Sequence, residues 1–121
     1  MPVLVDTSVW INHFRRPNPD LVALLAAKEV VRHTVVVGEL AVGNLADRED
    51  TLSELGDLPA LAEVQPRYAL GYIARHRLYG LGLSWGDAQL LAAADLSGIP
   101  IWTFDQRLQQ QAQAMNVSWT P

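Results

Sequence analysis

The chain has 121 residues, half of them hydrophobic, and a formal net charge of -4 at pH 7, which predicts a single folded domain over residues 1–121. It contains no cysteine, which excludes disulfides, thiolate catalysis and zinc bound by sulfur, so oxygen or imidazole must bind any metal. The apolar runs are too short to span a membrane and no signal-peptide pattern opens the chain, so we expect a cytoplasmic protein with no membrane partner. The negative net charge excludes only a uniformly basic nucleic-acid-binding surface.

Apolar runs and helix start signals divide the first half of the chain into two strands and four helices. Val3-Leu4-Val5 is a short apolar run of the kind that forms a buried strand. Asn18 followed by Pro19 is a helix start signal, an N-cap before a proline at the first helical position. The predicted elements are a strand over 3–5, helices over 7–14 and 19–28, a strand at 30–31, and helices over 34–45 and 47–55, the last with Gly56 as its C-cap.

The second half predicts helices separated by further short strands. Ser84 is the expected N-cap of a helix, and the run that starts at Ile99, after Gly98, predicts a buried strand. Because helices separate the strands and no hairpin signal joins them, we expect a three-layer α/β/α fold with a central parallel sheet of four to five short strands. The elements are a strand remnant at 63–64, helices over 66–78 and 85–96, a strand over 99–104, a helix over 106–114 and an edge strand over 117–119.

Two of the predicted strands end in a carboxylate with a hydroxyl nearby. Asp6 follows the first strand and is two residues from Ser8, and Asp105 comes two residues after Thr103. In open α/β sheets, ligands bind outside the carboxyl ends of the parallel strands. These four residues therefore predict a functional site at that edge of the sheet.

Two further acids interrupt apolar helix faces. Glu39 has valines three and four residues away on its predicted helix, and Asp87 has leucines at the same spacing on the 85–96 helix. Burying a charge without a partner costs several kcal/mol. We therefore expect both carboxylates to point inward and to meet a cation, a metal or hydrogen-bond donors, or else to lie where the apolar face opens into a cleft.

Each acid has a simpler alternative when it is considered alone. Asp6, Asp87 and Asp105 could each serve only as a helix cap, and Glu39 could pair with an arginine. Together, four carboxylates near one point with no lysine beside them repel one another, and they stay ionised at pH 7 only if a cation shares the site. Oxygen ligands in this number suit Mg²⁺ or Mn²⁺ with a substrate phosphate, which predicts a phosphoryl-transfer site.

Four segments, in this order and spacing over the whole length, resemble the motifs of PIN-domain ribonucleases, and most of all those of VapC-type toxins from type II toxin–antitoxin pairs. The segments are Val5-Asp6-Thr7-Ser8-Val9-Trp10-Ile11, Glu39-Leu40-Ala41-Val42-Gly43, Asp87-Ala88-Gln89-Leu90-Leu91-Ala92-Ala93-Ala94 and Trp102-Thr103-Phe104-Asp105-Gln106-Arg107-Leu108.

The resemblance implies a PIN-like fold and a metal-dependent endoribonuclease, which hydrolyses RNA phosphodiester bonds with a metal-activated water. It implies that a catalytic, Mg²⁺- or Mn²⁺-binding quartet consists of Asp6, Glu39, Asp87 and Asp105, with Ser8 and Thr103 in support. It also implies a homodimer and inhibition by a cognate VapB-like antitoxin. Many relatives have a further acid soon after the fourth, where this chain has Gln106-Arg107, which leaves open whether one metal or two are bound.

Three other residues are candidates for contact with RNA. Trp85 could stack on a base, although tryptophan more often packs against protein. Arg15 and Arg16 could bind phosphates, although solvated helix ends explain them equally well.

Other protein classes with acidic pockets fit the sequence less well. A receiver domain needs a late lysine, and the only lysine is Lys28. A phosphatase of the haloacid-dehalogenase type needs a second aspartate where Ser8 stands. A non-catalytic PIN-like binding module remains open, and metal-dependent cleavage would separate it from the nuclease.

Overall fold

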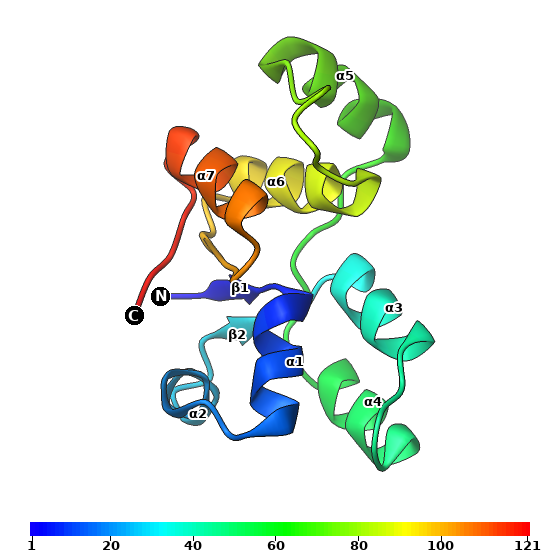
Figure 1. Cartoon of the computed structure of the whole chain (residues 1–121), viewed down its shortest axis with the longest axis vertical. Helices are drawn as coiled ribbons and strands as arrows, with labels where there is room; N and C mark the ends of the chain where they lie inside the picture. The colour runs from blue at the N-terminus through cyan, green and yellow to red at the C-terminus, as the bar shows by residue number, and fades with distance from the viewer.

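The computed structural model describes all 121 residues and contains three short strands and seven helices (Figure 1). The strands form one parallel sheet in the order β2-β1-β3, with β1 at Val3–Val5, β2 at Val30–Val31 and β3 at Ile101–Trp102. The helices are α1 (Thr7–Arg15), α2 (Pro19–Ala26), α3 (Thr34–Val42), α4 (Arg48–Gly56), α5 (Pro66–His76), α6 (Trp85–Ser97) and α7 (Gln106–Ala114).

The register of the sheet sets the position of the candidate site. In the central strand, Leu4 pairs with Val31 on one side and with Ile101 on the other, and Val5 pairs with Trp102. The backbone N–H of Asp6 then donates to the Trp102 carbonyl at 2.9 Å, one residue beyond the last strand pair. The chain segments that leave β1 and β3 therefore start side by side at the carboxyl edge of the sheet.

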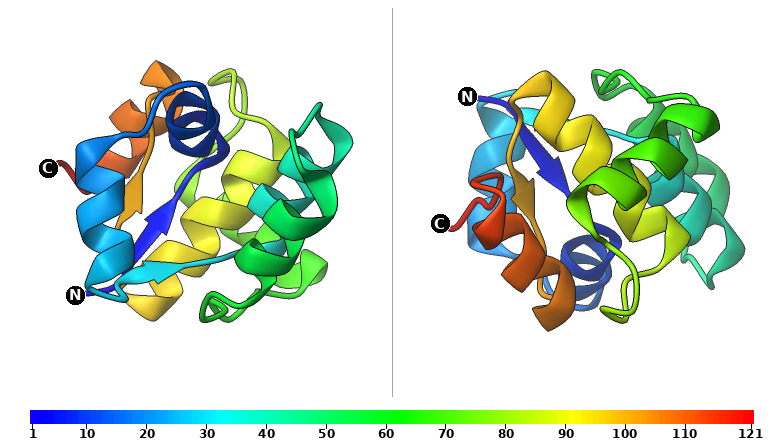
Figure 2. Two further views of the ribbon diagram at one scale, coloured as in Figure 1. Left: turned by 90° about the horizontal axis from the view of Figure 1, so that it is seen from below. Right: turned by 90° about the horizontal axis from the view of Figure 1, so that it is seen from above.

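Helices cover both sides of the strands, as the alternating pattern predicts. In Figure 1, α6 and α7 lie on one side of the strands and α1 and α2 on the other, while α3 and α4 lie beyond the carboxyl end of β1. The turned views in Figure 2 agree, and α5 packs on the outer side of α6. No helix has both the length and the apolar character needed to cross a bilayer.

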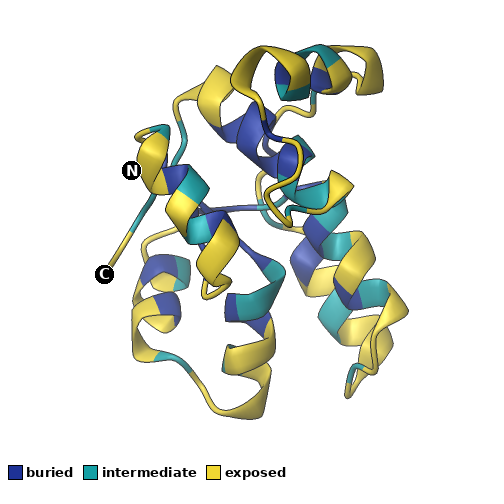
Figure 3. Ribbon diagram, turned by 45° about the horizontal axis from the view of Figure 1, so that its top comes forward, coloured by how far each residue is buried: buried dark blue, intermediate teal, exposed yellow.

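One hydrophobic core of 25 buried residues joins the sheet to these helices. All the strand residues are buried, as expected for a parallel sheet that is covered on both faces. Helix α6 supplies the unbroken buried run 90–94, so it is enclosed on several sides (Figure 3). Asp87 lies in the first turn of the same helix, about one turn before this buried run.

The strand count is lower than the predicted four to five. Two isolated parallel bridges replace the extra strands, one between Arg32 and Ala60 and one between Ile101 and Ser118. The 63–64 segment forms no strand, because the neighbouring chain turns into α3 at Thr34 and leaves it without a partner. The 117–119 segment contributes a single bridge in which Ile101 both donates and accepts.

Helix α2 ends at Ala26, two residues before the predicted end, and Lys28 beyond it has a φ of 59° in the left-handed region. Two further helices also end earlier than predicted. Helix α3 stops at Val42, because Gly43 adopts an extended conformation with ψ near 180°. Helix α5 stops at His76, because Arg77 enters the left-handed region with a φ of 54°. Neither conformation continues an α-helix.

Candidate active site at the carboxyl edge of the sheet

The centre of the site is a hydrogen-bonded network around Asp6. One carboxylate oxygen, Oδ2, accepts from the Thr103 hydroxyl at 2.7 Å and from the Ser8 hydroxyl at 2.9 Å. Asp6 is only 6% exposed, and it occupies the N-cap position of α1 without making a side-chain cap bond. The capping alternative for Asp6 is therefore wrong, because its carboxylate instead accepts from the hydroxyl of Ser8, in the first turn of α1, and from that of Thr103, in the loop after β3.

The same hydroxyls fix the backbone that leads to Asp105. Thr103 Oγ1 accepts from the Asp105 N–H at 3.0 Å, and Ser8 Oγ accepts from the Phe104 N–H at 3.0 Å. Asp105 itself is exposed and caps α7, with Oδ1 accepting from the Leu108 N–H at 2.9 Å. Ser8, in the first turn of α1, and Thr103 thus connect the chain segments that follow β1 and β3.

Asp87 approaches this network from the first turn of α6. Its Oδ2 accepts from the Ser84 N–H at 3.0 Å, and the Ser84 hydroxyl accepts from the Asp87 N–H at 3.0 Å, so the predicted cap is a complete capping box. Burial raises the pKa of the Asp87 carboxyl above its ordinary value, and the negative charges of Asp6 and Asp105 raise it further, against the bonds from Ser84. The negative charges of Asp6 and Asp105 are therefore close enough to Asp87 to repel its ionised carboxylate.

Glu39 lies at the side of the site and differs from the prediction. Full burial on an apolar stripe is wrong for Glu39, because its side chain is exposed. The alternative, a position where the stripe opens into a cleft, agrees with the structure, because Glu39 lines a cavity of about 580 Å³. Its Oε1 accepts from the Thr7 hydroxyl at 2.7 Å. Its Oε2 lies near the first turn of α6, because a Cβ built on Gly86 would be 3.9 Å from this oxygen.

The four carboxylates share a pattern of hydrogen bonding. In each of Asp6, Glu39, Asp87 and Asp105, one oxygen accepts from a group of the chain and no such bond reaches the other. None of them forms an ion pair, since the only pairs are Met1 with Glu29 and His33 with Glu63. Oriented carboxylates with free oxygens and no protein cation are a donor set that fits a hard divalent ion.

The carboxylates are not assembled as a finished metal cage. No three His, Asp or Glu side chains lie close enough together to ligate one ion. Glu39 and Asp105, the two exposed members, have the most room to move. The identity of the ligand set is therefore still a prediction from the sequence, which the hydrogen bonds support.

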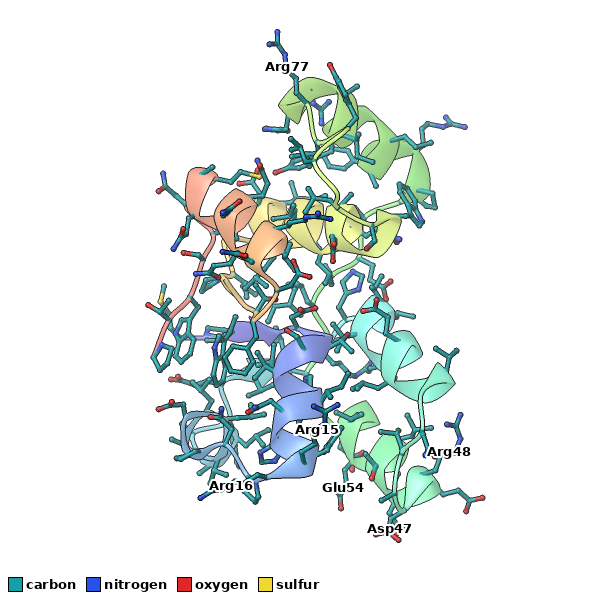
Figure 4. All side chains as sticks on the ribbon, in the orientation of Figure 1. Arg15, Arg16, Asp47, Arg48, Glu54 and Arg77 are labelled. Atoms are coloured by element: carbon teal, nitrogen blue, oxygen red, sulfur yellow. The ribbon has the colours of Figure 1, made fainter.

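The three candidates for RNA contact lie in different places. Trp85 is the first residue of α6 and is 45% exposed, two residues from Asp87. Arg15 lines a cavity of about 580 Å³ that also contains Glu39, in the region between α1 and α4 (Figure 4). Arg16 is exposed at the C-terminal end of α1, outside that cavity.

The site also involves Thr7 and Gly86, which the sequence pattern did not single out. The Thr7 hydroxyl donates to Glu39, and its position directly before Ser8, in a run of hydroxyl residues, was the available signal. Gly86 leaves room for Val35 of α3, because a Cβ at this position would lie 2.9 Å from Val35 Cγ1. A glycine inside the capping sequence gave no comparable indication, since helix starts tolerate glycine for many reasons.

The family model of the PIN domain matches residues 3–114, nearly the whole chain. The chain belongs to the PIN-domain family. This PIN chain is 41% identical over 108 residues to ribonuclease VapC32 of Mycobacterium tuberculosis, in strains CDC 1551 and H37Rv, with 88% of this chain and 87% of that protein covered. The resemblance to VapC-type PIN domains is thereby confirmed, and the receiver-like and phosphatase-like alternatives are removed.

Solved structures share the PIN fold at lower sequence identity. PAE2754 from Pyrobaculum aerophilum has a TM-score of 0.62 at 17% identity, over 92% of this chain and 79% of that one. FitAcB from Neisseria gonorrhoeae has a TM-score of 0.58 at 20% identity, over 96% and 94%. FitAB bound to an IR36 DNA fragment has a TM-score of 0.58 at 16% identity, over 96% and 92%. These likenesses confirm the predicted α/β class.

Proposed function

We propose that this PIN-domain protein is a VapC-type toxin, an endoribonuclease that hydrolyses RNA phosphodiester bonds in the cytoplasm with Mg²⁺ or Mn²⁺. The observation that carries the proposal is the set of four carboxylates, each oriented through one oxygen and free at the other, with no cation of the protein among them. The 41% identity to a relative named ribonuclease VapC32 supports the choice of RNA.

The proposed roles follow from the hydrogen bonds of each residue. Asp6, Glu39, Asp87 and Asp105 are the metal ligands, and Ser8 and Thr103 orient the buried carboxylate of Asp6. When bound, a divalent ion lowers the pKa of a water and offsets the charge of the scissile phosphate. Attack by water without a covalent enzyme intermediate leaves a 5′-phosphate and a 3′-hydroxyl.

Neutralising the carboxylate repulsion is the second effect expected from a cation. Burial and neighbouring charges raise the pKa of the Asp87 carboxyl, which means that its ionised form is unfavourable in the metal-free protein. A cation that binds only the folded chain adds RT ln(1 + [L]/Kd) to the free energy of unfolding. The substrate phosphate can approach this acidic edge only with such a cation present.

We also propose a protein partner, a cognate VapB-like antitoxin, and a homodimeric toxin. The cavity of about 580 Å³ beside Glu39 is suited to antitoxin binding, because its lining combines exposed Ile11 and Phe14 with Arg15. An inhibitor seated there would lie against one of the four proposed ligands. The free chain should then be toxic when it is expressed alone and harmless beside the protein encoded next to it.

The test is cleavage of a structured RNA mixture by the purified protein in Mn²⁺, in Mg²⁺ and in EDTA, with the ends identified by mass spectrometry. The nuclease is expected to cut only with the metals and to leave 5′-phosphates. RNA that is bound but never cut would establish the alternative, a non-catalytic binding module. Cleavage that persists in EDTA would remove the metal from the proposal.

A further inference from the structure

A second cavity, of about 600 Å³, lies next to the carboxylates on the β3 side of the sheet. Thr103 belongs to both places, because it lines the cavity and donates to Asp6. Phe104 also connects them, since its side chain lines the cavity and its backbone N–H donates to Ser8. The lining is completed by Asn18, Asp20, Trp102, Gln106, Gln109, Trp119, Thr120 and Pro121.

The cavity has aromatic walls. Trp102 is buried at the base, with its ring centroid 4.9 Å from that of Trp119 and 5.8 Å from that of Phe104. Phe104 is 51% exposed, although it sits directly beside the acidic site. Aromatic faces of this kind are the surfaces on which unpaired nucleobases stack.

The polar groups of the cavity have unused acceptors. Gln109 Oε1 is buried with no hydrogen-bond partner, and the Asp20 carboxylate forms no ion pair. Leaving a buried acceptor unpaired is unfavourable, so rotation of the Gln109 amide toward a donor in the cavity would be stabilising. The Asn18 side chain has no such freedom, because it caps α2 and donates to Asn12.

The lining contains no lysine, arginine or histidine. A phosphate is therefore a poor occupant, whereas a neutral ligand with an aromatic face and hydrogen-bond donors fits. Among nucleobases, adenine, cytosine and guanine carry an exocyclic amine that Asp or Gln can bind. Uracil offers only its N3–H, which lies between two carbonyl oxygens that a carboxylate would repel.

We propose that this cavity is a nucleobase subsite, in which an unpaired base with an exocyclic amine stacks on Phe104 and Trp119 and donates to Asp20 or Gln109. The inference rests on the proposed ribonuclease function, because the subsite adjoins the carboxylates through Thr103. Occupation of the cavity by one base would fix the position of the neighbouring phosphate. The subsite therefore determines at which nucleotide the RNA is cut.

The first experiment measures base binding without catalysis. Adenosine, cytidine and uridine are titrated in EDTA into the ¹⁵N-labelled protein, and the indole N–H signals of the tryptophans are followed by NMR. The Trp119 signal is expected to move at lower concentrations of adenosine and cytidine than of uridine. Phe104→Leu should abolish the shift, whereas Tyr79→Leu, at an aromatic residue that is 64% exposed outside the cavity, should keep it.

The second experiment measures base selection during cleavage. A randomised RNA pool is cut in Mn²⁺ and the bases flanking each cut are sequenced. The wild type should favour amine-bearing bases over uracil at one flanking position. Phe104→Leu should reduce that preference, because losing one stacking partner weakens occupation of the subsite by any base by about five- to 160-fold. Tyr79→Leu should leave rate and preference unchanged.

The two experiments separate the subsite from the nuclease. Selective nucleoside binding without any cleavage would support the subsite and remove the proposed function. Cleavage with the same base preference in Phe104→Leu and in the wild type would overturn the subsite and leave the nuclease intact. A Trp119 signal that no nucleoside moves would also overturn the subsite. If that signal moves only with a co-expressed antitoxin, the cavity is assigned to a protein partner instead.

Discussion

Replacing Asp6 by asparagine removes one charge from the centre of the site and keeps its shape. The amide oxygen can take the place of Oδ2 and accept from Ser8 and Thr103 as before. A hydrogen bond to a charged group contributes about 1.5–3 kcal/mol and a neutral one about 0.5–1.5 kcal/mol, so two weakened bonds cost about 2–3 kcal/mol. Relief of the burial of this charge and of its repulsion with Asp87 opposes that loss.

The net loss of stability should therefore be at most about 2 kcal/mol. A domain with a typical free energy of unfolding of about 5–15 kcal/mol stays almost wholly folded after such a loss. Losing a charged ligand should nevertheless lower the cleavage rate by a hundredfold or more, and a hundredfold corresponds to about 2.7 kcal/mol of transition-state stabilisation. Unfolding cannot produce a fall of that size, so the two effects can be distinguished.

The assay compares initial rates of RNA cleavage in Mn²⁺ for the wild type, Asp6→Asn and Asp50→Asn, with a melting curve for each protein. Asp50 is an exposed acid in the first turn of α4 and serves as the matched control. Asp50→Asn should cut at the wild-type rate. A folded Asp6→Asn protein that cuts within about twofold of the wild type, where a hundredfold loss is expected, would refute the catalytic role of this carboxylate.

Three other changes test neighbouring parts of the site and of the fold. Thr103→Val removes the hydroxyl that donates to Asp6 and should slow cleavage about tenfold, which corresponds to about 1.4 kcal/mol of transition-state stabilisation. Thr103→Ser keeps that hydroxyl and should cleave at the wild-type rate if the hydroxyl acts by positioning Asp6. Glu39→Gln should reduce cleavage with little change in melting temperature, because this side chain is exposed and glutamine can still accept from Thr7; a large loss of stability would contradict that placement. Burial lowers the pKa of His33 in the folded protein, although the charge of Glu63 opposes the shift. Below pH 6.5 the unfolded chain therefore binds a proton at His33 more readily than the folded chain does. The free energy of unfolding should fall as the pH drops from 6.5 through the lowered pKa. His33→Asn should keep the cap bond from the Val35 N–H and flatten this pH dependence in urea unfolding, and an unchanged slope would exclude His33 as its source.

The network around Asp6 was the part of the site most open to prediction from sequence. A strand followed by an acid and a hydroxyl places both groups at a known edge, and parallel pairing brings the ends of two such strands together. The register of Val5 with Trp102 then makes Asp6 and Thr103 neighbours. Only the partners of the hydroxyls, among them the Phe104 N–H, required the structure.

Glu39 shows where the helical pattern carried too little information. Helix α3 is apolar over most of its surface, so several faces look equally suited to the core. The face that packs is the one with Val36 and Leu40, while Val42 is 89% exposed. The direction of Glu39 was therefore decided by the neighbouring helices, and spacing alone could not reveal it.

The strand count failed for a related reason. A segment with strand-like composition forms a strand only if a neighbour extends alongside it. The segment at 63–64 has none, because the chain next to β2 turns into α3, and Ser118 finds one partner residue only, Ile101. The class of the fold depends on the order of helices and strands, which is local, and it was predicted correctly.

The most direct test of the metal-binding carboxylates is paramagnetic broadening of backbone amide NMR signals by substoichiometric Mn²⁺. Signals of Asp6, Ser8, Asp87 and Asp105 should broaden first, and the Asp6→Asn substitution should remove most of this effect. Acids outside the site, such as Asp50 on α4, should be unaffected at the same Mn²⁺ concentration. Broadening that centres on other acids, or that persists unchanged in Asp6→Asn, would contradict a metal site at the carboxyl edge of the sheet.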